Sequence, residues 1–382
     1  MEQFAPTRHA VHVLPEGGLE RKLAAGRPLR VKLGVDPTSP DVHLGFAVVL
    51  DRLREWQDAG NVVVLIVGDY TARIGDPSGR SSERPVLPDE ELDANAKHFA
   101  DQAFRILDRD RTEVRLNGEW LAELSFAEVV RLTRMLTVSR LLERDDFAKR
   151  FAAQEPISLS ELLYPPMQAY DSVAIDADVE IGGTDQLYNL LTGRDVMERY
   201  GKEPQIVVTY PLLVGLDGEE KMSKSRGNYV GILEPPEEMF GKTMSIPDKA
   251  LGQWWELLAG GGDHSESPLE WKLELARRIT ARWHGEDGAR AGEAHFTRVV
   301  RRHEAPEEVP EAPFAPVDGK AYLPALLQER FGSSGSHWRR QIDQGGVKLD
   351  GVPAAGYEVD AAVLDGAVVQ AGKRQFVRFR SG

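Results

Sequence analysis

The chain has 382 residues, which is too long for one ordinary hydrophobic core and predicts two or three domains. It contains no cysteine, so disulfides and thiolate zinc sites are excluded. The formal net charge of −14 argues against broad, nonspecific nucleic-acid binding but is compatible with a local basic patch. Nothing near the N-terminus is typical of a signal peptide or a spanning helix, and we expect a cytoplasmic protein without a membrane partner.

The first predicted strand and helix form a candidate phosphate site. Leu29–Val35 is an apolar, β-branched run, which predicts a buried parallel strand. Two prolines end this strand, and Asp41 is a suitable cap for a helix over residues 42–58. His43 and Gly45 then fall in the first helical turn, where free amides and the helix dipole favour a phosphate. The alternative is a histidine buried for structural reasons.

The second predicted strand, Asn61–Val67, leads into a loop rich in Gly, Asp and Thr. A loop of this kind at the carboxyl end of a strand is typical of the ligand crevice of an open α/β sheet. We assign Asp76, in this loop, to a substrate amine. A turn in which Asp76 only caps the residues after it would have the same sequence.

Residues 89–108 and 125–151 have helical patterns. The second stretch combines many apolar residues with many charges, so it faces either the core or a partner subunit. The sequence leaves both possibilities open.

The next predicted helix, residues 159–174, carries a polar stripe. Tyr164, Gln168 and Asp171 recur at i, i+4 and i+7, so they share one helix face. Polar stripes usually face water, but the apolar neighbours leave little room for a fully hydrated helix. We therefore expect this stripe to line a pocket.

A short strand starting at Val179 ends in Gly182 and Gly183, and the following helix is capped by Thr184 or Asp185. The glycines permit close approach of a ribose or base, and Asp185 can accept hydrogen bonds from ribose hydroxyls. A simple turn followed by an N-cap is the alternative. The alternation of strands and helices predicts a doubly wound parallel sheet.

The last predicted strand, residues 205–210, precedes the loop Lys221-Met222-Ser223-Lys224-Ser225. Two lysines three residues apart on a polar loop form a mobile cationic clamp, suited to phosphate groups that gain charge in a transition state. Taken alone, such a pair is more often part of a solvated surface loop.

The composition changes beyond the lysine loop, first to helices and then to a stretch rich in Pro and Glu, residues 305–319. The tail from Lys320 onward contains nine basic and six acidic residues, a local charge of +3. Arg339 and Arg340 lie on a predicted basic helix, and Lys348 lies in a turn-strand-turn segment. The tail is therefore a candidate RNA-facing module.

These motifs together resemble a known family. His43-Leu44-Gly45-Phe46 and Lys221-Met222-Ser223-Lys224-Ser225 resemble the HIGH and KMSKS signatures of class I aminoacyl-tRNA synthetases. The Tyr164, Gln168 and Asp171 face, followed by Gly182-Gly183-Thr184-Asp185-Gln186, resembles the amino-acid pocket of bacterial tyrosyl-tRNA synthetases. Gly75–Gly79 is similar to their amine-binding loop, and the tail resembles their S4-type RNA-binding domain. The resemblance covers essentially the whole chain.

The resemblance implies an α/β fold: a doubly wound, Rossmann-like parallel sheet with a helical domain and a small C-terminal α+β S4-like domain. The implied parts are a catalytic domain at 1–228 with a helical insertion at about 85–160 and the lysine loop at 221–225, a helical anticodon-side domain at 229–304, a linker at 305–319, and the S4-like domain at 320–382.

The implied reaction is activation of L-tyrosine by ATP, aided by Mg²⁺, followed by transfer to the 3′ end of tRNA(Tyr). The implied ATP-binding residues are Asp36, Thr38, His43, Gly45, Gly183, Asp185, Met222, Ser223 and Lys224, with His43, Lys221 and Lys224 as catalytic residues. For tyrosine they are Asp76, Tyr164 and Gln168 at the ammonium, Asp171 at the phenol hydroxyl, and Gln186 nearby. Arg339, Arg340 and Lys348 would contact tRNA, no residue is assigned as a metal ligand, and residues 125–151 would form a homodimer.

Three positions depart from the better-known family members. Phe46 replaces the second histidine of HIGH, and Val49 replaces a hydroxyl that contacts the ribose in many relatives, so Asp185 and the lysine loop would carry more of the nucleotide binding. Lys32 stands where those members have a phenol-binding tyrosine. We interpret it as part of a variant pocket in which Asp171 does more of the recognition.

Three other functions fit parts of the chain. A tryptophanyl enzyme shares the class I fold but generally lacks the S4-like tail and the Tyr/Gln/Asp face. A small nucleotidyltransferase is disfavoured by the complete lysine loop and the C-terminal additions. A non-catalytic RNA-binding paralogue has only Phe46 in its favour.

Overall fold

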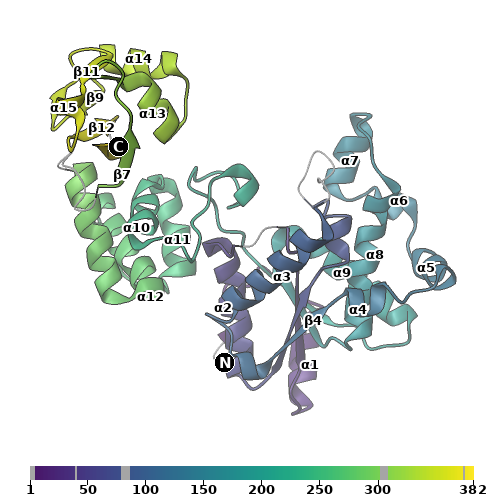
Figure 1. The fold of residues 1–382 in the computed structure, drawn as a ribbon. Helices are drawn as coiled ribbons and strands as arrows, with labels where there is room; N and C mark the ends of the chain where they lie inside the picture. The colour runs from purple at the N-terminus through teal and green to yellow at the C-terminus, as the bar shows by residue number, and fades with distance from the viewer. Residues whose placement is uncertain (1–4, 39–40, 79–86, 302–308, 373–374) are drawn as a thin grey trace. The chain divides into compact units, whose positions relative to one another are not determined.

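The computed structural model describes residues 5–38, 41–78, 87–301, 309–372 and 375–382 (Figure 1). The chain divides into two compact units, one of Met1–Glu234 with Ser245–Ser265 and the other of Pro235–Met244 with Glu266–Gly382. Gly79 of the expected amine loop lies outside the described residues, as do Lys373 and Arg374, two of the nine basic residues of the tail, and part of the stretch 305–319.

The first unit is built on a six-stranded sheet with the order β1-β6-β5-β2-β3-β4. The strands are β1 (His12–Leu14), β2 (Arg30–Val35), β3 (Val62–Val67), β4 (Thr112–Leu116), β5 (Val179–Gly183) and β6 (Ile206–Tyr210). All neighbouring strands are parallel except β1, which runs antiparallel to β6. The predicted doubly wound sheet is confirmed. The edge strand β1 was not predicted, because it has only three residues and all of them are half-buried.

Helices cover both faces of this sheet. Figure 1 shows α2 (Leu44–Asp58) and α3 (Asp89–Ala103) on one side, and α4 (Gly118–Leu121), α8 (Leu159–Ala174) and α9 (Leu187–Arg199) on the other. The chain moves outward from β2 to β3 and β4 but in the opposite direction from β5 to β6, and right-handed crossovers therefore place the helices on opposite faces. The order reverses between β2 and β5, which is where open α/β sheets bind ligands.

The predicted helix at 159–174 is confirmed to the residue, whereas two other helical predictions need correction. Helix α2 begins at Leu44, and the extended His43 is its N-cap in place of Asp41. The stretch 125–151 is broken into α5 (Phe126–Thr133), α6 (Val138–Leu141) and α7 (Asp145–Ala152). The break between α5 and α6 follows from local capping, because the hydroxyl of Thr137 accepts a hydrogen bond from the amide of Arg140 and starts a new helix.

The remaining helices of the first unit are α1 (Gly18–Ala24) and α11 (Leu251–Leu258), and those of the second are α10 (Pro236–Ser245), α12 (Pro268–Phe296), α13 (Leu323–Phe331), α14 (Gly335–Asp343) and α15 (Ala361–Leu364). In the part of the chain that the structure describes, no helix is both long enough and apolar enough to cross a membrane.

In the second unit, α10 packs on α12 through Phe240, Met244, Leu273, Ala276 and Phe296. Gly292 permits this contact, because a Cβ atom there would lie 2.8 Å from the carbonyl oxygen of Pro236. Gly285 interrupts α12 with a φ of 72°, so the two helical segments on either side of it meet at a kink.

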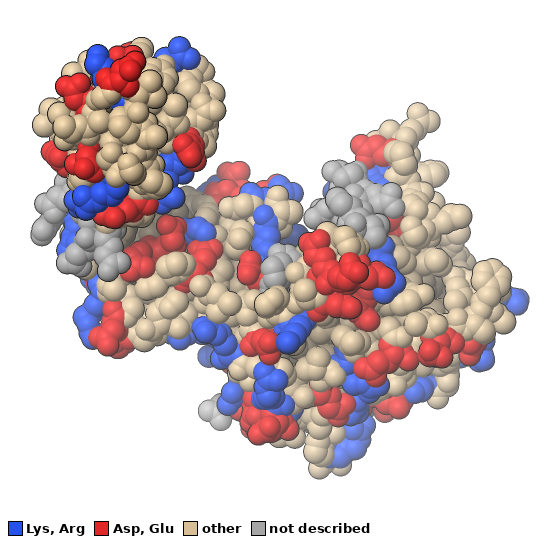
Figure 2. Space-filling view, in the orientation of Figure 1, with Lys and Arg blue, Asp and Glu red and all other residues tan. Residues whose placement is uncertain are grey.

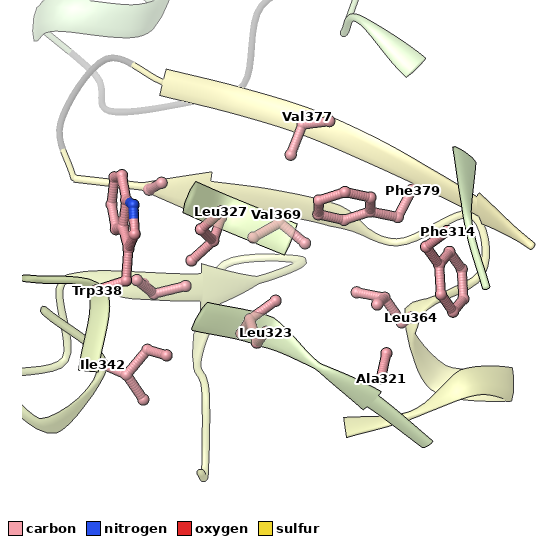
Figure 3. Packing of buried hydrophobic residues seen from close by; sticks show 12 residues of the cluster. Phe314, Ala321, Leu323, Leu327, Trp338, Ile342, Leu364, Val369, Val377 and Phe379 are labelled. Carbon is pink, nitrogen blue, oxygen red and sulfur yellow. The ribbon is translucent and has the colours of Figure 1, made fainter. Parts of the chain in front are cut away.

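The C-terminal part of the second unit contains a five-stranded sheet in the order β10-β9-β12-β13-β7 and a two-stranded sheet of β11 and β8. The strands are β7 (Glu311–Phe314), β8 (Lys320–Tyr322), β9 (Val347–Leu349), β10 (Val352–Pro353), β11 (Glu358–Asp360), β12 (Val368–Ala371) and β13 (Gln375–Ser381). Figure 3 shows the core between this sheet and helices α13 and α14, where Trp338 donates to the carbonyl of Gly332 at 2.8 Å.

Strand β7 lies within the stretch 305–319 that the sequence suggests is a linker. It pairs in parallel with β13, and its last residue, Phe314, packs edge-on against Phe379 at 6.2 Å between ring centres. The sequence did not predict this strand, because the segment is rich in Pro and Glu and the strand residues before Phe314 are at least partly exposed.

A buried ion pair joins β2 to β5 in the core of the first unit. The Lys32 side chain is fully buried, and its Nζ donates to Glu180 Oε1 and Ser172 Oγ at 2.8 Å each and to the carbonyl of Gln168 at 3.0 Å. Glu180 Oε2 also accepts from Gln205 Nε2 at 2.8 Å. The ammonium thus uses all three of its donors inside the protein.

We expect Lys32→Ala to lower the free energy of unfolding by about 3–5 kcal/mol, because it leaves the carboxylate of Glu180 buried without its counter-ion. Urea denaturation followed by circular dichroism measures this loss. The control is Lys202→Ala, which removes a partly exposed pair with Asp176 and should cost about 1 kcal/mol or less. Equal, small losses in both variants would contradict the structural role of Lys32.

Candidate active site

A pocket of about 830 Å³ opens at the carboxyl ends of the parallel strands in the first unit. Its size is in the usual range for small-molecule sites. It brings together all fifteen positions that the sequence assigns to ATP or tyrosine: Asp36, Thr38, His43, Gly45, Asp76, Tyr164, Gln168, Asp171, Gly183, Asp185, Gln186, Lys221, Met222, Ser223 and Lys224. Arg339, Arg340 and Lys348 belong to the second unit.

His43 lies at the start of α2 with its side chain almost entirely buried. Its Nδ1 atom has no hydrogen-bond partner among the described residues. Burial lowers the pKa of His43 to about 3, and the charges of Lys224 and Lys221 act in the same direction. The ring is therefore neutral at physiological pH, with one nitrogen as donor and one as acceptor. A Cβ at Gly45 would lie 3.0 Å from the ring, so a glycine there leaves room for it.

Phe46 supports the imidazole in place of a second histidine. Its ring centre lies 4.7 Å from that of His43, and it meets Phe99 edge-to-face at 5.6 Å. Phe46 and Val49 both line the pocket. This part of the wall is therefore apolar and orients His43 by packing.

Both lysines of the loop are engaged. Lys221 Nζ lies 2.5 Å from Asp185 Oδ2, and Lys224 Nζ donates to the carbonyl of Asp41. Burial lowers the pKa of Lys224 to about 8, against the opposing charge of Asp41. The loop is anchored by Met222, which is buried and whose amide donates to the carbonyl of Leu213 at 2.8 Å.

Asp36 and Tyr164 connect the end of β2 to α8. The Tyr164 hydroxyl donates to Asp36 Oδ2 at 2.9 Å, and Thr71 Oγ1 donates to Asp36 Oδ1 at 2.8 Å. Asp36, which is assigned to ATP, and Tyr164, which is assigned to tyrosine, are thus hydrogen-bonded to each other.

Asp171 lies at the buried end of the polar stripe on α8. Trp120 Nε1 donates to its Oδ1 at 2.8 Å, and Asn117 Nδ2 lies 3.3 Å from its Oδ2. Burial raises the pKa of Asp171 to about 7, although the charge of Lys32 and these two hydrogen bonds act against the shift. The sequence interpretation missed Asn117 and Trp120. One signal was available for Asn117: it directly follows β4, at the carboxyl ends of the strands where the pocket lies.

Lys32 differs from its predicted role. It is absent from the pocket lining because its ammonium is bound inside the core. It acts on the pocket indirectly, through the carbonyl of Gln168 and through its charge near Asp171. The amide oxygen of Gln168 is buried and has no partner among the described residues, so this side chain can still receive a donor.

Asp76 is held as an anion. Gln186 Nε2 donates to Asp76 Oδ2 at 2.7 Å and the amide of Ser78 donates to Oδ1 at 2.9 Å, while the Arg144 guanidinium lies 3.6 Å from Oδ1. Burial raises the pKa of Asp76, but the charge of Arg144 and the hydrogen bonds outweigh it and leave the pKa below its usual value. Arg144 is a third residue that the sequence interpretation missed.

Solved structures share this fold. A tyrosyl-tRNA synthetase from Archaeoglobus fulgidus, complexed with L-tyrosine, aligns with a TM-score of 0.63 and 24% identity over 75% of this chain and 96% of its own. The tyrosyl-tRNA synthetase of Aeropyrum pernix aligns with a TM-score of 0.60 and 21% identity, over 76% and 97%. At these identities the similarity supports the fold alone.

Similarity in sequence is higher. The tyrosine–tRNA ligase of Thermotoga maritima is 48% identical over 98% of this chain and 96% of its own length, and that of Moorella thermoacetica is 46% identical over 98% and 94%. Residues 24–295 match the family described as tRNA synthetases class I (W and Y). The chain therefore belongs to this family of class I tRNA synthetases.

Proposed function

We infer that this chain is a tyrosine–tRNA ligase, which activates L-tyrosine with ATP and transfers the tyrosine to tRNA. The inference rests on similarity over nearly the full length to tyrosine–tRNA ligases, together with one pocket that holds both the lysine loop and the Tyr164, Gln168 and Asp171 face. A tryptophan-specific enzyme is not favoured, because these curated relatives are tyrosine–tRNA ligases. ATP–pyrophosphate exchange with each amino acid in turn tests the inference, and we expect exchange with tyrosine alone.

We assign the nucleotide end of the pocket to Thr38, His43, Gly183, Asp185 and the lysine loop. In the proposed step the tyrosine carboxylate attacks the α-phosphorus in line, an anhydride bond forms, and the bond to pyrophosphate breaks. Negative charge grows on the leaving group, where Lys221 and Lys224 would stabilise it. Neutral His43 would donate to a phosphate oxygen, and Asp185 would accept from the ribose once Lys221 has moved to the phosphates.

We assign the other end of the pocket to tyrosine. Asp76 supplies negative charge for the ammonium, with Tyr164 and Gln168 as acceptors beside it and Gln186 nearby. The Tyr164 hydroxyl donates its proton to Asp36, and a phenolic oxygen can accept a hydrogen bond while it donates one. Asp171 would accept from the phenol hydroxyl.

Mg²⁺ is part of the proposal as an ion carried by the phosphates of ATP. Among the described residues no group of three or more His, Asp or Glu side chains could hold a metal. Asp36 and Asp185 are the carboxylates at the nucleotide end that could add a ligand, and Mg²⁺ commonly combines one or two carboxylates with substrate phosphates. When bound, the ion would offset phosphate charge.

We propose that the C-terminal part, residues 320–382, binds tRNA, with 229–304 as the anticodon-side domain and a location in the cytoplasm. Arg339 and Arg340 are exposed on α14, and the half-buried Lys348 lies on β9. Figure 2 shows basic and acidic side chains interspersed on this part. Such a surface would position tRNA through a few phosphate contacts.

We propose a homodimer that forms through the helical insertion. Large apolar side chains are exposed there: Phe126 (84%), Val138 (60%), Phe151 (65%) and Leu159 (81%). Large apolar side chains exposed on successive helices are candidates for an interface between subunits. Light scattering should give twice the chain mass of 42.4 kDa, and Phe126→Glu should shift the protein toward the monomer. A monomeric wild-type protein would contradict the proposal.

We expect Lys224→Ala to slow tyrosyl-adenylate formation by about a hundredfold or more while tyrosine affinity changes little, because the cation acts mainly in the transition state. Rapid-quench measurement of the first turnover and equilibrium dialysis with tyrosine separate the two effects. Lys249→Ala, which removes an exposed ion pair with Glu219, is the control and should match the wild type. An unchanged rate in Lys224→Ala would rule out this assignment.

We expect Asp171→Asn to reduce the kcat/KM ratio of tyrosine over phenylalanine by roughly ten- to a hundredfold, because a charged acceptor for the phenol is lost. ATP–pyrophosphate exchange with both amino acids measures the ratio. If the ratio is unchanged, another group recognises the phenol.

The same ratio should depend on pH. The pKa of Asp171 is raised to about 7, so the carboxylate that accepts from the phenol becomes available as the pH rises through that value. The tyrosine-to-phenylalanine ratio should therefore increase with pH in the wild type and stay flat in Asp171→Asn. Taking a ratio cancels ionisations that affect both substrates equally, including that of Lys224.

A further inference from the structure

Hydrogen bonds and one ion-pair contact form a ring of side chains that includes Asp76. Arg144, in the segment between α6 and α7, is buried, and its guanidinium donates to Ser78 Oγ and to Asn189 Oδ1, both at 3.0 Å. Asn189 Nδ2 donates to Gln186 Oε1 at 3.1 Å, and Gln186 Nε2 donates to Asp76 Oδ2 at 2.7 Å. The ring closes where the guanidinium lies 3.6 Å from Asp76 Oδ1. It joins the helical insertion, the loop after β3 and helix α9.

The charge of Arg144 is compensated by another carboxylate. Asp146 accepts from Arg144 Nε at 2.8 Å and from Nη2 at 2.9 Å, and its side chain is also buried. This is a two-point pair of the kind that fixes a guanidinium in orientation. Because Asp146 offsets part of the charge of Arg144, the guanidinium can keep Asp76 ionised without cancelling its negative charge toward a ligand.

We propose that Arg144, held by Asp146, is a positioning residue for the substrate ammonium. It orients Asp76 and Gln186 through the ring, so its effect is specific to ligands that carry an amine. This inference rests on the proposed assignment of Asp76 to the ammonium.

A purely structural ion pair would give a different result. If Arg144 only stabilised the junction of α6 and α7, its loss would weaken every ligand of the pocket to a similar degree. Two tyrosine analogues separate these cases. Tyramine has the phenol and the ammonium without the carboxylate, and 3-(4-hydroxyphenyl)propanoate has the phenol and the carboxylate without the ammonium.

The experiment measures the inhibition constant of each analogue against tyrosine in ATP–pyrophosphate exchange, with the full-length protein. In Arg144→Gln the constant for tyramine should rise roughly tenfold or more, while that for 3-(4-hydroxyphenyl)propanoate should change by less than roughly twofold. Arg144→Lys should recover part of the tyramine affinity. The control Arg109→Gln removes an exposed pair with Asp101 and should change neither constant.

Asp146→Asn is a second, nearly isosteric variant that serves if Arg144→Gln does not fold. It leaves the guanidinium uncompensated beside Asp76, where it competes with the ammonium, so tyramine should again be weakened selectively. Equal loss for both analogues, or no loss, in the Arg144 and Asp146 variants would overturn the inference.

Asp76→Asn distinguishes this failure from failure of the assignment beneath it. If Asp76→Asn weakens tyramine selectively while the Arg144 and Asp146 variants do not, only the role of Arg144 is wrong. If Asp76→Asn weakens both analogues equally, the assignment of Asp76 to the ammonium is wrong, and the inference about Arg144 is wrong with it.

Discussion

The ion pair between Lys32 and Glu180 forms the floor on which the pocket is built. Strands β2 and β5 are in register at only two positions, and Lys32 opposite Glu180 is the second of them. Beyond this pair the next residues of both strands, Leu33–Val35 and Ile181–Gly183, line the pocket. The buried pair therefore stands where the two central strands stop pairing and the crevice begins. A buried pair is costly unless its hydrogen bonds are complete, and here Ser172, Gln205 and the carbonyl of Gln168 complete them.

Three carboxylates in the pocket differ because their partners differ. Asp36 accepts from two hydroxyls and connects β2 with α8. Asp76 has a guanidinium nearby, which keeps its pKa low in spite of burial. Asp171 has neutral donors, and the charge of Lys32 is already balanced by Glu180, so burial prevails and its pKa rises to about 7. The pocket thus holds one carboxylate that stays ionised, Asp76, which we assign to the ammonium, and one that titrates near neutrality, Asp171, which we assign to the phenol.

The sequence predicts residues that act through local patterns and misses those that act through tertiary contacts. The stripe of Tyr164, Gln168 and Asp171 follows from helix periodicity alone, and the helix has the bounds expected of it. Asn117, Trp120 and Arg144 come from other segments. The position of Asn117 after a strand indicates the pocket edge, but no local pattern shows that these residues contact Asp171 or Asp76. The burial of Lys32 in an ion pair with Glu180 is likewise a tertiary contact that its own segment does not predict.

The two lysines of the loop have protein partners in the structure, and we assign them to phosphates in the nucleotide-bound state. Lys221 is paired with Asp185, the carboxylate that we assign to the ribose, and Lys224 is bound to the backbone at Asp41. A bound nucleotide would offer ribose hydroxyls to Asp185 and phosphates to Lys221, so both partners of the pair would exchange one polar contact for another. The exchange avoids leaving a partly buried charge without a partner, which is the costly alternative. Phe46 supplies packing where the HIGH signature has a second histidine, so we assign the leaving pyrophosphate to these two lysines and His43. In this assignment, nucleotide binding would be coupled to the release of Lys221 from Asp185 and of Lys224 from Asp41.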